Sequence, residues 1–339
     1  MHSPVLGFTL VFIAAVAGGG LAVPLKKRRK FELENIYVPA TLVMMIILPL
    51  VMAAFVTPNW MEAVHAAGAQ TVYAGMAYGF GWGIGAILFG YGVTMAGMSV
   101  GYAIIMGVNT AVGSILPFLV KSPSDLLTPG GMVILSGIAG CVIGVAVCGR
   151  AGALRERQFG STDQRHGFGG ALLVCAASGV LSSCANLGFA FTSRVGDEAQ
   201  RLGASSVFST LASWMPVFWG AATSLLLWFG TLQIKRGTWR KNTGPGAAHD
   251  WLMGAVMGVV WFLATIPYGM GSYYLGRLGT SVGWAVNIAS SLIVANAFGF
   301  LTGEWTRAPV GSRRTLYSGL AILIAAIVLL AVGSSMTGY

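Results

Sequence analysis

The sequence predicts an all-α, polytopic membrane protein in which ten transmembrane helices form two inverted-topology five-helix repeats, residues 1–160 and 161–339. Three observations lead to this prediction. Of the 339 residues, 55% are hydrophobic and 9% are charged, whereas soluble domains carry about 25% charged residues. The basic residues cluster in alternate loops, and one short motif occurs once in each half.

Ten apolar runs give the spans in order. A helix needs about 20 predominantly apolar residues to cross the hydrocarbon core of a bilayer. Runs bounded by charged or turn residues occur at 5–25, 37–56, 72–94, 100–120, 132–148, 168–191, 207–232, 251–275, 282–302 and 316–332. Because the cluster Lys26 to Lys30 follows the first run instead of preceding it, we expect a retained span rather than a cleavable signal peptide.

The basic loops predict the orientation of these spans. Sixteen of the 20 Lys and Arg residues fall in alternate loops, namely Lys26 to Lys30, Arg150 to Arg165, Lys235 to Lys241 and Arg307 to Arg314. Cytoplasmic loops carry such an excess. We therefore expect these loops in the cytoplasm of a bacterial cell, the protein in the inner membrane and both termini facing outward.

The duplicated motif indicates the architecture. Residues 97–104 read GMSVGYAI and residues 279–286 read GTSVGWAV, with five of the eight positions identical. Each copy opens a helix, the fourth and the ninth, which lie five spans apart. An odd separation means that the two halves enter the membrane in opposite directions. Inverted repeats of this kind build many secondary transporters, with the substrate site between the halves near the midplane.

Uncharged polar and aromatic side chains form stripes on four of the expected helices. On the fourth helix, Ser99, Tyr102, Met106, Asn109 and Gly113 follow helical spacing. Aromatic rings stack on the C–H face of a sugar, and amide or hydroxyl groups bond its hydroxyls. The substrate-binding residues that we predict from these stripes are Trp82, Tyr102, Asn109, Tyr268, Trp284 and Asn287. Asn296 lies out of phase with Asn287, so we expect it in helix packing.

Carboxylates are confined to loops and helix ends, although ionisable residues inside a span are what usually mark a proton pathway. Glu34, Asp250 and Glu304 lie closest to the expected spans. They are the predicted candidates for proton coupling. Interfacial packing or pairing with the loop arginines is the alternative role.

Several local patterns together resemble one known family. They are Pro24-x-Lys26-Lys27 with Phe31 and Glu34, Ile47-Leu48-Pro49, Trp82-Gly83-Ile84-Gly85, Gly97-Met98-Ser99, Arg150-Ala151-Gly152-x-Leu154-x-Glu156, and Glu304-Trp305. In order and spacing, from about residue 5 to residue 337, they resemble the bacterial L-rhamnose/proton symporter family of the drug/metabolite transporter superfamily. The resemblance implies uptake of a small neutral sugar such as L-rhamnose, with a proton, by alternating access.

Other classes of function fit the sequence poorly. No Walker motif, DxxD, DxD or CxxC pair occurs, so we expect neither an ATP-driven pump nor an enzyme, and no cofactor or metal. The net charge of +10 comes from short interhelical blocks, which suits the lipid surface rather than nucleic acid. The alternative left open is an exporter or exchanger of metabolites or drugs from the same superfamily.

Overall fold

The computed structural model describes residues 3–19, 24, 27–158 and 168–337, and every regular element among them is helical. The longer helices are α1 (Pro4–Gly19), α3 (Leu33–Leu42), α4 (Leu48–Val56), α6 (Ala69–Ala96), α7 (Met98–Lys121), α8 (Pro129–Gln158), α9 (Phe168–Phe191), α11 (Ser209–Arg236), α12 (Ala247–Tyr274), α13 (Val282–Leu301) and α14 (Val310–Met336). Short elements are η1 (Val43–Ile47), α5 (Trp60–Ala66), η2 (Pro123–Asp125), α10 (Ser193–Arg201), η3 (Thr238–Asn242) and η4 (Gly276–Leu278).

Nine segments of the described chain are long and apolar enough to cross a membrane. They correspond to the second through tenth predicted spans, with α3, η1 and α4 forming one segment, Leu33–Val56. The first predicted span appears as the shorter apolar helix α1, and most of its expected last residues lie outside the described part of the chain. The predicted all-helical membrane class is therefore confirmed.

Two helices extend well beyond their predicted bounds. Helix α8 continues to Gln158 instead of ending at residue 148, and α14 begins at Val310 instead of residue 316. The extra turns contain Arg, Ala, Leu and Glu, which are good helix formers although they are not all apolar. As a consequence, Arg155 and Glu156 stand on a helix rather than in the loop that the apolar run suggested.

The second span is interrupted in its middle by a π-helical turn, η1. The N–H of Leu48 donates to the carbonyl of Val43, five residues earlier. Pro49 follows directly, and a proline lacks the N–H of a regular helix and crowds the carbonyl four residues before it. The wider turn accommodates that proline.

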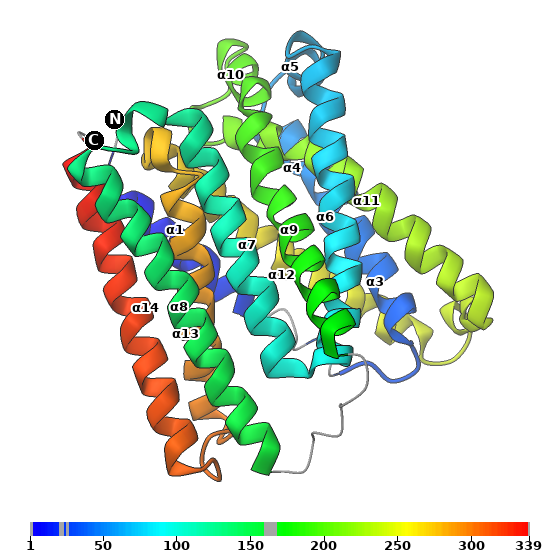
Figure 1. Cartoon of the computed structure of the whole chain (residues 1–339). Helices are drawn as coiled ribbons and strands as arrows, with labels where there is room; N and C mark the ends of the chain where they lie inside the picture. Colours follow the sequence, from blue (N-terminus) through cyan, green and yellow to red (C-terminus); the bar gives the residue numbers. More distant parts are fainter. Residues whose placement is uncertain (1–2, 20–23, 25–26, 159–167, 338–339) are drawn as a thin grey trace.

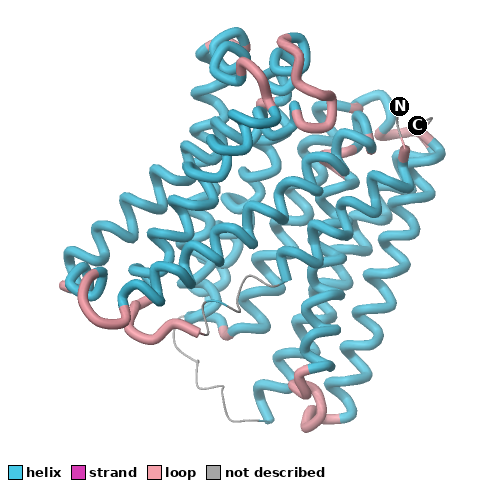
Figure 2. Tube along the Cα trace, turned by 180° about the vertical axis from the view of Figure 1, so that it is seen from behind, coloured by secondary structure: helices cyan, strands magenta, loops and turns pink. Residues whose placement is uncertain are grey.

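Figure 1 shows the long helices lying side by side in one bundle, and Figure 2 shows the same bundle from behind. Helix α8 packs along α14, α6 lies against α9 and α11, and α12 lies against α1 and α3. Helix α7 packs against α8, α9 and α13, and α13 also contacts α1 and α14. Helices α7 and α13, which begin with the duplicated motif, thus meet each other inside the bundle.

Glycines let α6 approach two neighbours closely. A Cβ atom on Gly79 would lie 1.9 Å from the carbonyl oxygen of Val217 on α11, and Gly83 faces Ser224, which is also on α11. One on Gly85 would lie 2.6 Å from the amide nitrogen of Ser182 on α9. The glycines of α6 therefore face two different partners, as small residues do in membrane bundles.

The ends of the molecule differ in charge. The start of α1 lies beside the end of α12, and the start of α8 lies beside the end of α14, through Gly7 and Gly130 respectively. At the other end lie the last turns of α8, α11 and α13 (Figure 1), together with the described residues that precede α3. We call this the basic end, because it carries Lys30, Arg155 and Arg236.

Candidate functional site

Aromatic side chains from five helices, α6, α9, α11, α12 and α13, meet inside the bundle. The ring centroids of Trp82 and Trp261 are 6.0 Å apart, and those of Trp82 and Trp214 are 6.5 Å apart. Trp214 stacks between Phe189 and Phe218, at 4.6 and 5.3 Å. Trp82 is only partly buried, whereas Trp214 is 3% exposed.

Tyr268 and Trp284 extend this cluster toward α7. Their ring centroids are 5.5 Å apart in an edge-on arrangement, and Tyr268 also lies near Trp214. The indole N–H of Trp284 donates to the backbone carbonyl of Asn109 at 3.3 Å. A Cβ atom at Gly113 would lie 2.5 Å from that indole nitrogen, so only glycine leaves room for the ring.

Asn186 of α9 joins the helices at this point. Its side-chain amide donates to the carbonyls of Gly113 and Thr280, at 2.7 and 2.6 Å, and its oxygen accepts the Tyr268 hydroxyl at 2.5 Å. Asn186 is fully buried. We call Trp82, Asn109, Asn186, Trp214, Tyr268 and Trp284 the central cluster.

Four of the six predicted substrate residues, Trp82, Asn109, Tyr268 and Trp284, belong to the central cluster. Asn287 is half-buried on α13 and lies outside these contacts. Asn186 and Trp214 were not predicted. Asn186 could have been found as an amide inside the apolar run 168–191. Trp214 could not be told apart from an interfacial tryptophan, because its role depends on the side chains that pack against it in the folded protein.

Several buried polar atoms around the central cluster have no hydrogen-bond partner among the described residues. They are the side-chain oxygens of Asn109, Ser114 and Thr280 and the indole nitrogen of Trp214. A buried polar group without a partner costs about 1–3 kcal/mol. These groups therefore need partners that the described protein residues do not supply.

Tyr102 lies elsewhere, in a cavity of about 140 Å³ between α7, α8 and α13. Its ring packs edge-on against Phe89. The cavity is lined by Met98, Ser99, Tyr102, Val145, Cys148, Gly149, Gly152, Leu292 and Asn296. Asn296, which we expected in packing, therefore contributes to a cavity wall, although its amide nitrogen also bonds the Leu292 carbonyl of its own helix.

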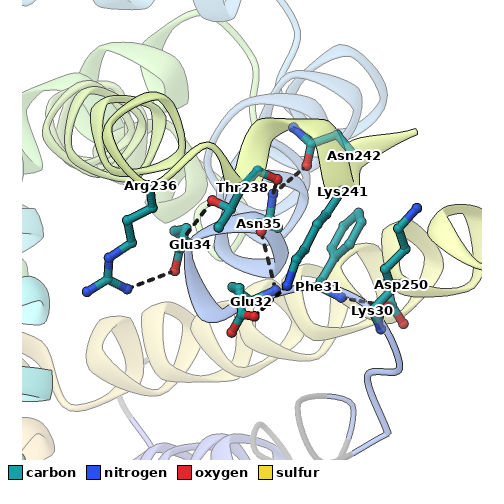
Figure 3. Close-up of polar contacts among 10 residues, drawn as sticks. All are labelled: Lys30, Phe31, Glu32, Glu34, Asn35, Arg236, Thr238, Lys241, Asn242 and Asp250. Atoms are coloured by element: carbon teal, nitrogen blue, oxygen red, sulfur yellow. Dashed lines mark hydrogen bonds and ion pairs between the residues drawn. The ribbon is translucent and has the colours of Figure 1, made fainter. Parts of the chain in front are cut away.

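The carboxylate of Glu34 is buried at the basic end, with a side chain 2% exposed. It accepts the hydroxyl of Thr238 at 3.0 Å and lies 3.6 Å from the largely exposed guanidinium of Arg236. The next residue, Asn35, donates to the Thr238 carbonyl and to Asn242. Figure 3 shows these residues joining the start of α3 to the end of α11 and to η3.

Asp250 holds the same region from the start of α12. Its two oxygens accept the backbone N–H groups of Arg29, Lys30 and Phe31 at 2.9, 2.6 and 2.8 Å. Three donors suit an ionised carboxylate, which only accepts hydrogen bonds. We call the contacts of Asp250, Glu34, Asn35 and Glu32 the basic-end clamp.

Glu32 belongs to the exposed edge of that clamp (Figure 3). The Lys241 ammonium donates to its carboxylate at 2.6 Å, and this bond lowers the pKa of Glu32 below its ordinary value. Both side chains remain substantially exposed, and exposed pairs of this kind contribute about 0–1 kcal/mol. Glu32 is thus an ionised surface group.

Glu304 is the most exposed of the three predicted proton-coupling residues, with a side chain 53% exposed. It lies 3.6 Å from Arg155, whose guanidinium also sits 4.6 Å above the Trp305 ring. A carboxylate that was not predicted, Glu156, lies on the same turn of α8. It accepts both the backbone N–H and the hydroxyl of Ser99 at the start of α7.

Known proteins resemble this chain over nearly its whole length. The family described as "L-rhamnose-proton symport protein (RhaT)" matches residues 2–337. Proteins named L-rhamnose-proton symporter from Escherichia coli (strain 55989 / EAEC) and from Shigella boydii serotype 18 are each 24% identical over 335 residues, which cover 97% of this chain and 97% of the relative.

Proposed function

The chain belongs to the L-rhamnose-proton symport family, and from this premise we propose that it takes up L-rhamnose, or a closely related sugar, together with a proton by alternating access. The protein is a transporter and not an enzyme. The observation that carries the choice of substrate is the central cluster, in which aromatic rings surround buried polar atoms that lack partners. The exchanger or exporter is not favoured, because both relatives are named as symporters.

We infer that the bundle consists of two inverted five-helix repeats, with their junction near residue 160. If the halves are equivalent, α1 corresponds to α9, α3–α4 to α11, α6 to α12, α7 to α13 and α8 to α14. Under this equivalence, the contact between α6 and α9 in one arrangement corresponds to the contact between α12 and α1 in the other. In the same way, the contact between α6 and α11 corresponds to the contact between α12 and α3. All four pairs are in contact, which supports the proposal.

The same proposal gives the protein an orientation. The basic end faces the cytoplasm by the positive-inside rule, and both termini face outward. The contacts between the start of α1 and the end of α12, and between the start of α8 and the end of α14, support this orientation. Localisation is then the bacterial inner membrane.

In the substrate site that we propose, the rings of Trp82 and Tyr268 contact the C–H groups of the sugar. Trp214 offers only its edge, because Phe189 and Phe218 stack on its two faces. Asn109 and Asn186 offer amides to its hydroxyls. Trp284 covers Gly113 from the outward end, whereas Tyr102 and Asn287 lie along the route on α7 and α13. A bound sugar would supply the partners that the buried atoms of Asn109 and Trp214 lack, which is favourable because unmet buried groups are costly.

Among the three predicted proton-coupling residues, the surroundings of Glu34 fit the role best. It is buried, and its cation partner is largely exposed at 3.6 Å. Asp250 accepts three backbone donors, so we assign to it the holding of the chain before α3. Glu304 is exposed beside Arg155, so we assign to it a surface ion pair and not the binding of a proton.

The test is transport in proteoliposomes. We expect L-rhamnose to enter down an imposed proton gradient and to alkalinise the outside medium. The variants Asn109→Ala and Trp82→Ala should weaken rhamnose binding at least tenfold without lowering expression, because a lost bond to a buried polar group costs about 1–3 kcal/mol. Uptake that is unchanged in both variants contradicts the proposed site, and rhamnose entry without alkalinisation contradicts symport.

A further inference from the structure

The duplicated motif begins two helices at opposite ends of the molecule. One copy follows the turn between α6 and α7, where Gly97 has a φ of +87°. The other follows the turn between α12 and α13. In each case a polar side chain from a neighbouring helix accepts or donates a hydrogen bond at the turn, and the two contacts differ in chemistry.

The hydrogen bond at the turn between α12 and α13 joins two neutral groups. The Asn186 amide donates to the Thr280 carbonyl at 2.6 Å, and Thr280 is the second residue of the GTSVGWAV motif. A side-chain amide does not titrate, so a change of pH leaves this bond as it is. We call it the amide latch.

At the turn between α6 and α7, the hydrogen-bond acceptor is a carboxylate. Oε1 of Glu156 accepts the Ser99 backbone N–H at 3.2 Å and the Ser99 hydroxyl at 2.6 Å. Ser99 is the third residue of the GMSVGYAI motif. Both bonds therefore hold the first turn of α7 against the last turns of α8. We call this pair the acidic latch.

The acidic latch adjoins the cavity of about 140 Å³ described above, because Ser99 is both a latch residue and part of the cavity lining. Tyr102, Cys148 and Asn296 line the same cavity. A movement of the start of α7 away from α8 would therefore open this cavity toward the basic end. The cavity, the turn and the latch form one continuous region.

The helices packed around Glu156 carry several other charged residues. Helix α6 carries no charged residue, and the one on α7, Lys121, is at its far end. On α8, Arg155 pairs with Glu304, and Arg157 is exposed. Ser312 bonds the Ala151 carbonyl, which brings the neighbouring Arg313 and Arg314 of α14 near the end of α8. Within the described residues, no ion pair holds Glu156.

We propose that Glu156 makes the opening of the basic end depend on protonation, so that a proton releases the acidic latch while the amide latch stays closed. The inference rests on the proposed function as a proton symporter. The proton binds the carboxylate and converts it to a neutral carboxyl. Charge-assisted hydrogen bonds are about twice as strong as neutral ones, so the hold on Ser99 weakens, and release of the proton restores it.

Thiol labelling of Cys148 tests the proposal directly. The other cysteines, Cys141, Cys175 and Cys184, are replaced by Ser, and a membrane-impermeant maleimide is added to reconstituted full-length protein on the side of the basic end. We expect Glu156→Gln and Ser99→Ala to label on the order of tenfold faster than the parent at neutral pH, since hydrogen bonds to a charged group are stronger than bonds between neutral groups. Glu304→Gln, which breaks a neighbouring ion pair, is the matched control and should label like the parent.

The pH dependence separates the latch from a merely loosened helix. Each rate is expressed relative to Glu156→Gln at the same pH, which cancels the titration of the thiol itself. The parent rate should approach that of Glu156→Gln as the pH falls. A constant ratio at every pH, or an equal increase in Glu304→Gln, overturns the proposal.

Transport measurements distinguish failure of the latch from failure of the proposed function. Glu156→Gln should retain exchange of labelled for unlabelled L-rhamnose and lose accumulation driven by a proton gradient. Retained exchange also shows that the variant is folded. If the parent itself does not move rhamnose, the proposed function fails, and the labelling ratio still decides whether the latch responds to protons.

Discussion

Gly113 illustrates how one residue shapes the central cluster. The Trp284 indole closes over it and donates to the carbonyl of Asn109, while Asn186 donates to the carbonyl of Gly113 itself. A side chain at position 113 would occupy the space of the ring. The packing of α13 on α7 at this point therefore depends on the absence of a Cβ atom.

We predict that Gly113→Ala expels the indole and lowers rhamnose uptake at least tenfold. A Cβ atom 2.5 Å from the indole nitrogen forces a shift, and overpacking a close contact costs about 1–3 kcal/mol. Gly90→Ala is the matched control, because a Cβ atom on that helical glycine would meet nothing within 4 Å. Uptake and tryptophan fluorescence measure the effect, and equal behaviour of the two variants would contradict this role of Gly113.

At the scale of elements, the basic-end clamp determines how the chain enters α3. Residues 29–31 precede the helix without regular structure, and their N–H groups bond to Asp250 at the start of α12. Asn35 in the first turn reaches Asn242 beyond α11. Three segments that are distant in sequence are thereby fastened together at one end of the bundle.

We predict that Asp250→Asn lowers the free energy of unfolding by about 2 kcal/mol or more. The new amide turns its NH₂ group toward backbone donors, and bonds to a charged group contribute about 1.5–3 kcal/mol each. The control Glu32→Gln breaks an exposed pair at the same clamp and should cost less than about 1 kcal/mol. Thermal unfolding in detergent measures both, and equal shifts would show that Asp250 does not hold the loop.

At the scale of the whole molecule, the inverted repeats that we propose give the two halves matching neighbours. Helix α8 lies against α14 and α7 lies against α13, and each of these pairs joins two helices that correspond in the proposal. Such self-pairing is expected where a pseudo-two-fold axis passes between inverted repeats. The central cluster takes residues from both halves, so a rocking motion of one half against the other would rearrange it.

The inverted arrangement predicts the outcome of topology labelling. In a background without native cysteines, Arg29→Cys and Arg240→Cys should react with a membrane-impermeant maleimide only in inside-out vesicles. Leu127→Cys, which lies exposed at the opposite end, should react only in right-side-out vesicles. Reaction of positions 29 and 240 from different sides would remove the physical basis for the carrier.

Much of the fold was accessible from the sequence alone, because the bilayer imposes a strong constraint. Unpaired backbone groups are too costly in lipid, so long apolar runs must be helices. The bounds of α9 were predicted correctly, whereas the ends of α8 and α14 were missed because helix formation continues where apolar character stops. The helices α5 and α10, of 7 and 9 residues, are too short to appear as membrane spans in the sequence.

By itself, the sequence determined the membrane class, the family resemblance and the residue types suited to a sugar, since composition and local spacing already express them. Only the tertiary structure decided which of those residues meet. Trp82, Asn109, Tyr268 and Trp284 come from four helices, and their proximity arises from helix crossings that no local pattern encodes. Asn186, Trp214 and Glu156 emerged for the same reason, because a side chain acquires its role from the partners that packing brings to it.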